Sequence, residues 1–208
     1  MLRNIHLFSD LNDAQREELA SLAETVSYKK GDIVIHQGEN SDSLYIILYG
    51  QLKVIFTDEE GHQTILAILG DKDFFGELSL LDSRPRSATV QAMQDSRLLR
   101  LNRQHILSFI TASPGASMAM MQSMADRVRV LDETFCRFSH LDISGRILET
   151  LTRIAKQETD HLVTPKLTQQ DIADLVGASR EMVNRTLKEL KDAGEIQQEG
   201  KQFVIPGG

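Results

Sequence analysis

Cysteine is nearly absent from this chain of 208 residues, and its single copy, Cys136, excludes an internal disulfide. One thiolate is also too few for a cysteine-ligated iron–sulfur cluster, which needs several. No run of about 18 apolar residues occurs, so no transmembrane helix is expected. Residues 1–19 are too acidic and too often interrupted by polar residues for a signal peptide. We therefore expect a cytoplasmic protein with no membrane partner.

An excess of positive charge is also missing. The chain has 23 Lys and Arg against 30 Asp and Glu, which gives a formal net charge of −7. Residues 142–208 alone carry 9 basic and 11 acidic residues. This balance argues against a non-specific nucleic-acid binder. It does not exclude a sequence-specific nucleic-acid binder, because a few well-placed arginines can dominate the electrostatic potential at a contact face.

Short β-rich segments fill the first half of the chain and are separated by polar turns about every 8–12 residues. The expected strands are 32–36, 44–48, 51–57, 64–69, 90–92 and 97–101, with a polar hairpin turn at 58–63. Such a series predicts a β-sandwich or a small barrel.

Helical patterns lie on both sides of these strands. Helices are expected at 9–24, 102–113, 116–139 and 143–155, with a break at 113–115. A polar loop is expected at 156–166, with one short strand at 162–164 as an alternative. The apolar residues of the stretch 116–139 are spaced alternately three and four apart: Met121, Met124, Val128, Leu131, Phe135 and Phe138. A 3.5-residue period favours a seam between two copies of this helix over packing on the chain's own barrel. The opposite, charged face, which includes Arg127, suits water.

Residues 75–90, FGELSLLDSRPRSATV, have the composition of a pocket for a phosphate that carries a sugar. Gly76 lets the backbone come close to a ligand, and Glu77 can accept a hydrogen bond from a ribose hydroxyl. Arg86 supplies a planar fork that suits phosphate oxygens. The alternative is an ordinary β-turn with a solvated arginine. The candidate ligand residues of this cassette are Gly76, Glu77, Leu78, Ser79, Arg86 and Ser87.

Residues 168–189 have the pattern of a helix-turn-helix, the alternative being a purely structural helix pair. Thr168 with Asp171 is a cap pair for a first helix, and Gly177 suits its left-handed end. A second helix follows Ser179, and its outer face is polar and sized for the major groove. A short hairpin around Lys201 has the character of a wing. The candidate DNA contacts are Thr168, Gln169, Ser179, Arg180, Glu181, Asn184, Arg185, Lys188 and Lys201.

With these motifs in place, the chain resembles the CRP/FNR family of transcription regulators, and in particular its catabolite activator branch. The resemblance is strongest at 35–39 (IHQGE), 58–61 (DEEG), 75–90, 141–151 (LDISGRILETL) and 171–190. It implies an α+β architecture with three parts: a cyclic-nucleotide-binding β-barrel (jelly roll) at 1–115, a dimerisation helix at 116–139, and a winged helix-turn-helix at 140–208. It also implies a homodimer that binds a palindromic DNA operator and acts on RNA polymerase. Arg180, Glu181 and Arg185 match the family's base-reading residues and imply a half-site that contains G·C pairs.

The resemblance implies that the cassette holds the ribose and cyclic phosphate, but the base contacts differ. Leu131 and Asp132 replace a Thr-Ser pair that touches adenine, and Ala67 stands where a hydroxyl-bearing residue meets the base. Cyclic AMP is the favoured effector. The Asp132 carboxylate also suits the N–H groups of guanine, so a cyclic GMP-responsive regulator remains an alternative.

Two further alternatives are a ligand-independent DNA-binding regulator that keeps the barrel as a scaffold, and a nucleotide-binding module that works through protein contacts.

The N-terminal cysteines of the family's oxygen sensors are absent, and the six histidines are scattered. We therefore expect no metal, haem or iron–sulfur cluster. No nucleophile, base and orienting group form a recognisable motif, so an enzyme is not expected.

Overall fold

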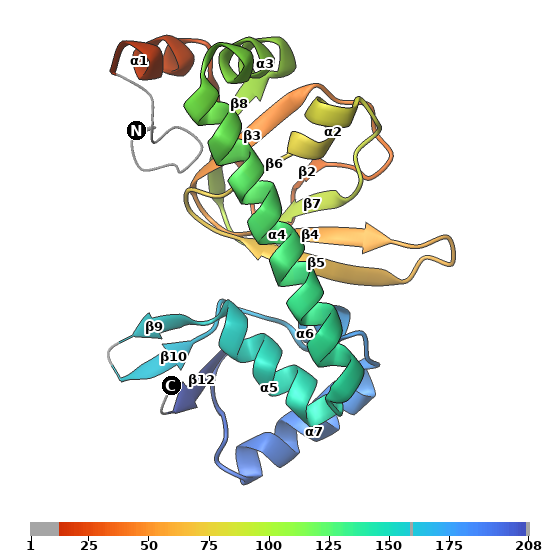
Figure 1. Cartoon of the computed structure of the whole chain (residues 1–208). Helices are drawn as coiled ribbons and strands as arrows, with labels where there is room; N and C mark the ends of the chain where they lie inside the picture. The colour runs from red at the N-terminus through yellow and green to blue at the C-terminus, as the bar shows by residue number, and fades with distance from the viewer. Residues whose placement is uncertain (1–12, 159, 207–208) are drawn as a thin grey trace. The chain divides into compact units, whose positions relative to one another are not determined.

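The structure is a computed structural model that describes residues 13–158 and 160–206 (Figure 1). The chain divides into two compact units, Met1–Arg129 and Val130–Gly208. The boundary falls within the longest helix, α4 (Pro114–His140). Among the described residues, no helix is both long and apolar enough to cross a membrane.

Two four-stranded antiparallel sheets make up the body of the first unit, in the orders β1-β8-β3-β6 and β2-β7-β4-β5. The strands are β1 (Glu24–Tyr28), β2 (Ile33–Ile35), β3 (Ser43–Tyr49), β4 (Leu52–Thr57), β5 (Gln63–Leu69), β6 (Phe74–Phe75), β7 (Thr89–Ala92) and β8 (Ser96–Asn102). The predicted β-sandwich is confirmed. The sequence did not predict β1, because its segment ETVSY contains little of the apolar alternation that marks a strand.

The strand β3 is buried on both faces, because successive side chains of a strand point to opposite sides. Leu44 and Ile46 belong to a cluster that includes Leu80 of α2 and Ile106 of α3. The alternate residues, among them Ile47, belong to a second cluster to which both sheets contribute. One strand thus joins the core between the sheets to the core beneath the helices.

Three helices besides α4 pack on this unit: α1 (Asp13–Ser21), α2 (Glu77–Asp82) and α3 (Arg103–Ala112). Leu19 of α1 is buried, but Leu22 is exposed because α1 ends before it. Residues 9–12 of the helix expected at 9–24 lie outside the described residues.

The break between α3 and α4 is shorter than the three residues expected. Pro114 is the first residue of α4, and only Ser113 separates α4 from α3. Proline is accepted at this position because its missing N–H would have no helical partner there. The expected break at 113–115 is therefore wrong in its extent.

The second unit combines the helices α5 (Ile143–Ile154), α6 (Gln169–Val176) and α7 (Arg180–Asp192) with a four-stranded sheet in the order β11-β12-β10-β9. Its strands are β9 (Lys156–Glu158), β10 (His161–Val163), β11 (Gln197–Glu199) and β12 (Gln202–Pro206). The expected loop at 156–166 is therefore wrong at β9, while the short strand expected within it at 162–164 is present as β10. Its strands form because β10 pairs with β12, a partner about 40 residues later that local sequence does not reveal.

Candidate functional site

Arg86 is the most buried cation of the cassette, with only 3% of its surface exposed. Its Nη1 donates to the carbonyl of Gly76 at 2.7 Å, and its Nη2 donates to the carbonyl of Ser43 at 2.5 Å and to Ser41 Oγ at 2.8 Å. Burial lowers the pKa of the guanidinium, while nearby acidic groups such as Glu77 oppose that shift. The alternative of a turn with a solvated arginine is therefore excluded.

Gly76 makes this position of Arg86 possible. It has a φ of 88° and lies at the N-terminal cap of α2. A Cβ at Gly76 would lie 2.6 Å from Arg86 Nη1 and 2.9 Å from the Ser43 carbonyl oxygen. The close approach that glycine allows is therefore to the side chain of Arg86, a contact the sequence did not predict.

Gly76→Ala is expected to lower the free energy of unfolding by about 2–4 kcal/mol, from left-handed strain of about 1–2 kcal/mol together with the displaced guanidinium. Chemical denaturation measures this loss. Gly61→Ala is the matched control, because Gly61 has a φ of 86° and nothing within 4 Å of an added Cβ. Equal losses in the two variants would contradict the contact between Gly76 and Arg86.

Glu77, the first residue of α2, is also only 3% exposed. Its Oε1 accepts a hydrogen bond of 2.5 Å from Arg127 Nη1. Arg127 also donates to the carbonyl of Phe74 at 2.7 Å and lies over that ring, 5.1 Å from its centroid. The expectation that this face of α4 meets water is wrong for Arg127. Its partner is 50 residues away in the sequence, so no local signal could have identified it.

Two buried atoms of the cassette have no hydrogen-bond partner among the described residues: Arg86 Nε and Glu77 Oε2. A buried donor or acceptor without a partner is costly and calls for a ligand or water. The donor belongs to a cation and the acceptor to a carboxylate. A group that carries a hydroxyl beside a phosphate satisfies both, so the residues fit a cyclic nucleotide.

The remaining predicted ligand residues differ in their surroundings. Ser79 is buried, Ala67 is half-buried, and Leu78 and Ser87 are exposed. Leu131 and Asp132 are exposed on α4 and belong to the second compact unit. Their contact with a base stays a prediction.

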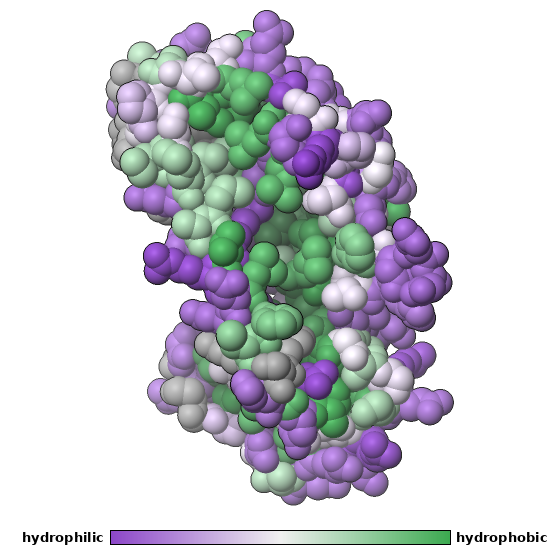
Figure 2. Space-filling model, turned by 45° about the vertical axis from the view of Figure 1, so that its right-hand side comes forward, coloured by the Kyte–Doolittle hydropathy of each residue, from purple (hydrophilic) through white to green (hydrophobic). Residues whose placement is uncertain are grey.

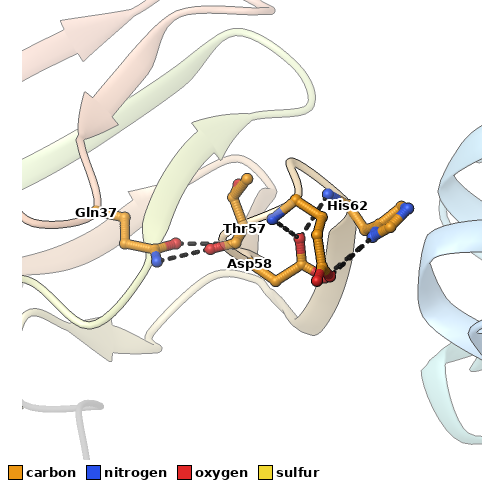
Figure 3. A network of polar contacts seen from close by, with 5 residues as sticks. Gln37, Thr57, Asp58 and His62 are labelled. Carbon is orange, nitrogen blue, oxygen red and sulfur yellow. Dashed lines mark hydrogen bonds and ion pairs between the residues drawn. The ribbon is translucent and has the colours of Figure 1, made fainter.

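The turn that follows β2 supports the backbone of Arg86. The N–H of Gly38 donates to the Arg86 carbonyl at 2.8 Å, and the Arg86 N–H donates to the Glu39 carbonyl at 2.9 Å. The side-chain amide of Gln37 exchanges two hydrogen bonds with the backbone of Thr57, of 2.9 and 2.8 Å (Figure 3). This turn thus joins the cassette to the base of the β4–β5 hairpin.

The turn of the same hairpin carries the one group of possible metal ligands among the described residues. Ligand atoms of Asp58, Glu60 and His62 lie within 4.8 Å of one another, and all three residues are exposed. Asp58 already accepts hydrogen bonds from the backbone N–H groups of Glu60 and His62, and its other oxygen meets His62 Nδ1 at 3.1 Å (Figure 3). These bonds account for the proximity of the three side chains without an ion.

Caps define both helices of the helix-turn-helix in the second unit. The N–H of Asp171 donates to Thr168 Oγ1 at 3.1 Å, and the N–H of Thr168 donates to Asp171 Oδ2 at 2.9 Å, which forms a capping box. Gly177 ends α6 with a φ of 64°, and Ser179 Oγ accepts from the N–H of Met182 at the start of α7. The hydroxyls of Thr168 and Ser179 thus serve as caps, and Thr168 Oγ1 also donates to Asp171 Oδ2 at 2.6 Å. The contact of both residues with DNA phosphate stays a prediction.

The two faces of α7 have different roles. Val183, Leu187 and Leu190 are buried on its inner face. The predicted base contacts on the outer face are all exposed: Arg180, Glu181, Asn184, Arg185 and Lys188. Within the described part of the chain, no hydrogen bond or ion pair holds these five side chains. They are therefore available to base edges and phosphates, as are the exposed Gln169 and Lys201.

Family models match the two regions of the chain that contain these candidate sites. A model of the cyclic nucleotide-binding domain matches residues 25–113, and a model of the Crp-like helix-turn-helix domain matches residues 145–206. A cyclic nucleotide-binding domain joined to this DNA-binding module defines a DNA-binding transcription regulator with a cyclic nucleotide effector, and not an enzyme.

Two relatives identify the family. The cAMP-activated global transcriptional regulator CRP of Salmonella typhimurium is 37% identical over 186 residues, which cover 86% of this chain and 88% of that protein. The CRP-like cAMP-activated global transcriptional regulator of Mycobacterium tuberculosis is 32% identical over 210 residues, which cover 99% of this chain and 94% of that protein. The chain belongs to the CRP/FNR family.

Solved structures have the same fold. The catabolite activator protein of Thermus thermophilus is 27% identical, with a TM-score of 0.58, and the match covers 96% of this chain and 93% of that one. The c-di-GMP responsive regulator CLP of Xanthomonas campestris has a TM-score of 0.81 over 95% of this chain and 100% of that one. Its identity is 22%, so that similarity speaks for the fold alone.

Proposed function

We propose that the protein is a homodimeric transcription regulator whose binding to a palindromic operator is controlled by cyclic AMP. The observation that carries this proposal is the pair of partnerless buried atoms, Arg86 Nε and Glu77 Oε2. The phosphate would meet the guanidinium, and the ribose hydroxyl would donate to the carboxylate. Relatives described as cAMP-activated support this choice of nucleotide.

The apolar residues of α4 support the homodimer. Met121, Val128, Leu131 and Phe135 are all exposed, with Phe135 at 77%. Met124 instead packs against the barrel core, and nothing is described of the Phe138 side chain. Exposed apolar residues are visible among hydrophilic ones on the face drawn in Figure 2. These exposed residues of α4 recur with a 3.5-residue period, so a second copy of α4 would cover them.

In the proposed mechanism, the nucleotide favours one arrangement of the dimer and shifts its population, so that two copies of α7 reach successive major grooves about 34 Å apart. The bound dimer would then act on RNA polymerase. We retain Ala67, Leu131 and Asp132 as proposed base contacts on the sequence resemblance. Cyclic GMP stays the second candidate because the Asp132 carboxylate is exposed and can accept from guanine.

Calorimetric titration with cyclic AMP and cyclic GMP, followed by a DNA-shift assay with each, tests this function. We expect heat of binding with cyclic AMP, weaker binding of cyclic GMP, and a sequence-specific shift that requires cyclic AMP. A preference for cyclic GMP would reassign the base contacts. No heat with either nucleotide, together with a DNA shift, would indicate a ligand-independent regulator. Binding of nucleotide with no DNA shift would indicate a module that works through protein contacts.

A further inference from the structure

The phosphate cassette receives a second arginine contact, from the first residue of α3. Arg103 Nε donates to the carbonyl of Leu80 at 3.0 Å, and its Nη2 donates to Ser83 Oγ at 2.7 Å. Leu80 lies in the last turn of α2, and Ser83 is its C-terminal cap, with a left-handed φ of 60°. A cation at a helix C-terminus binds carbonyls that the helix itself leaves without a donor.

Arg103 is itself held firmly. Asn102 caps α3 by accepting from the N–H of Gln104, and Ile106 of the same helix is fully buried beside Leu80. The backbone N–H of Arg103 donates to the carbonyl of Asp42 at 2.6 Å. Asp42 lies between Ser41 and Ser43, the two residues that accept from Arg86 Nη2, so Arg103 contacts both the end of α2 and the segment that holds the Arg86 side chain.

The short helix α2 therefore has a guanidinium at each end. Arg127 binds the Glu77 carboxylate at the first residue, and Arg103 binds the last turn and the cap. Among the described residues, Arg103 is the one side chain from outside the cassette that makes a hydrogen bond to residues 80–85. Residues 83–85 are exposed, so no packing replaces this bond.

We propose that Arg103 is a positioning residue for the nucleotide phosphate, because it fixes the end of α2 from which the chain runs to Arg86. The proposal rests on the proposed function, since it requires a phosphate at Arg86. Without Arg103, the segment 80–85 gains freedom, and fewer contacts fix the orientation of Glu77 relative to Arg86, whose partnerless atoms face the ligand. Binding then has to order this segment, which weakens affinity.

Arg103→Gln is expected to weaken cyclic AMP binding about 10-fold, as the loss of charge-assisted hydrogen bonds to the cassette predicts. Arg103→Lys keeps one charged donor and should recover part of the loss. Ser83→Ala removes only the hydroxyl acceptor and should have a smaller effect, about 3-fold, that adds little to Arg103→Gln in the double variant. Calorimetry on the full-length chain measures all four affinities.

Arg84→Gln is the matched control, because it removes the same charge from the same segment. Its side chain is 82% exposed, and its nearest ionic partner is Asp82 at 3.9 Å. It should change affinity by less than about 2-fold. A loss in Arg84→Gln equal to that in Arg103→Gln would assign the effect to net charge and overturn the proposal. Wild-type affinity in Arg103→Gln would overturn it too.

Amide hydrogen exchange of the ligand-free protein separates this proposal from the proposed function. Arg103→Gln should speed exchange at residues 77–86 and leave the strands of the barrel unchanged. Uniform acceleration across the barrel would indicate a general loss of stability and would overturn the positioning role, as would unchanged exchange. If the wild-type protein binds neither cyclic nucleotide, the proposed function fails, while the exchange comparison still decides whether Arg103 holds α2.

Discussion

Replacing Arg86 by leucine is expected to weaken cyclic AMP binding at least about 100-fold, because the phosphate loses charge-assisted hydrogen bonds worth about 1.5–3 kcal/mol each. No neighbouring cation of the cassette can take its place, since the side chain of Arg84 is 82% exposed and directed to solvent. The DNA shift that depends on cyclic AMP should disappear with the affinity. Calorimetric titration measures the first loss, and a mobility-shift assay measures the second.

The leucine variant also loses stability, because the carbonyls of Gly76 and Ser43 keep no donor from residue 86. Each buried carbonyl left without a partner costs about 1–3 kcal/mol. Titrations therefore belong at a temperature where circular dichroism shows that the variant is folded. Arg86→Lys, a point charge without the planar fork, should bind between the leucine variant and the wild type.

Arg84→Leu is the control for this experiment, since it makes the same change two residues away on the exposed part of the cassette. It should bind cyclic AMP within about 3-fold of the wild type. If Arg86→Leu also binds within that range, the phosphate does not lie at Arg86, and the pocket is assigned to the wrong residues.

Much of the fold could be predicted because its signals are local. The helix-turn-helix follows from Thr168 and Asp171, which form the capping box, and from Gly177, which has the left-handed φ that ends α6. The strand β3 follows from an apolar run that is buried on both faces. These features depend on residues a few positions apart, so the sequence carries them directly.

The features that could not be predicted depend on partners far apart in the chain. The strand β9 has only polar residues and exists because it pairs with β10, which in turn pairs with the wing strand β12. Arg127 lies on the charged side of α4, where water was the expected partner, yet it binds Glu77. Arg103 appears in sequence only as the start of a helix. A charged residue gives no sign of a distant partner, because its local pattern is the same whether it meets water or a carboxylate.

The cassette illustrates how these two kinds of information combine. Its spacing identified Gly76, Glu77 and Arg86 as a set, and the structure brings them together. The structure adds that Arg86 is held by carbonyls and a hydroxyl rather than by a carboxylate. An arginine held in this way keeps its full positive charge for an anion, because none of its hydrogen-bond acceptors carries a charge.

Arg180→Ala is expected to weaken binding to the operator at least about 30-fold, because each subunit loses a base contact worth about 1–3 kcal/mol. Arg180 is the first residue of α7 and is exposed, while the inner face of that helix rests on other residues, including the fully buried Val183. The substitution should therefore leave the free energy of unfolding unchanged. The loss of affinity for the operator then results from the lost contact with DNA. The probe is a duplex selected by the wild-type protein from random-sequence DNA in the presence of cyclic AMP.

The affinity from a base contact depends on the DNA sequence, whereas the affinity from a phosphate contact depends mainly on salt. This difference distinguishes the role of Arg180 from that of Lys201. Arg180→Ala should relax the preference for a G·C pair at one position of each half-site. Lys201→Gln, in the turn between β11 and β12, should instead weaken selected and random duplexes alike, and should lower the slope of log K against log salt by about 1 per subunit.

Lys191→Gln is the matched control on α7, because Lys191 Nζ is already bound to Gln198 Oε1 at 3.0 Å. It removes the same charge from the same helix, and its effect on the selected duplex should stay within about 3-fold. If Arg180→Ala keeps the wild-type base preference, or if Lys191→Gln loses as much affinity, then α7 attracts DNA by net charge alone. The exposed face of α7 would then hold DNA without reading it, and the bases would be read by other residues of the second unit.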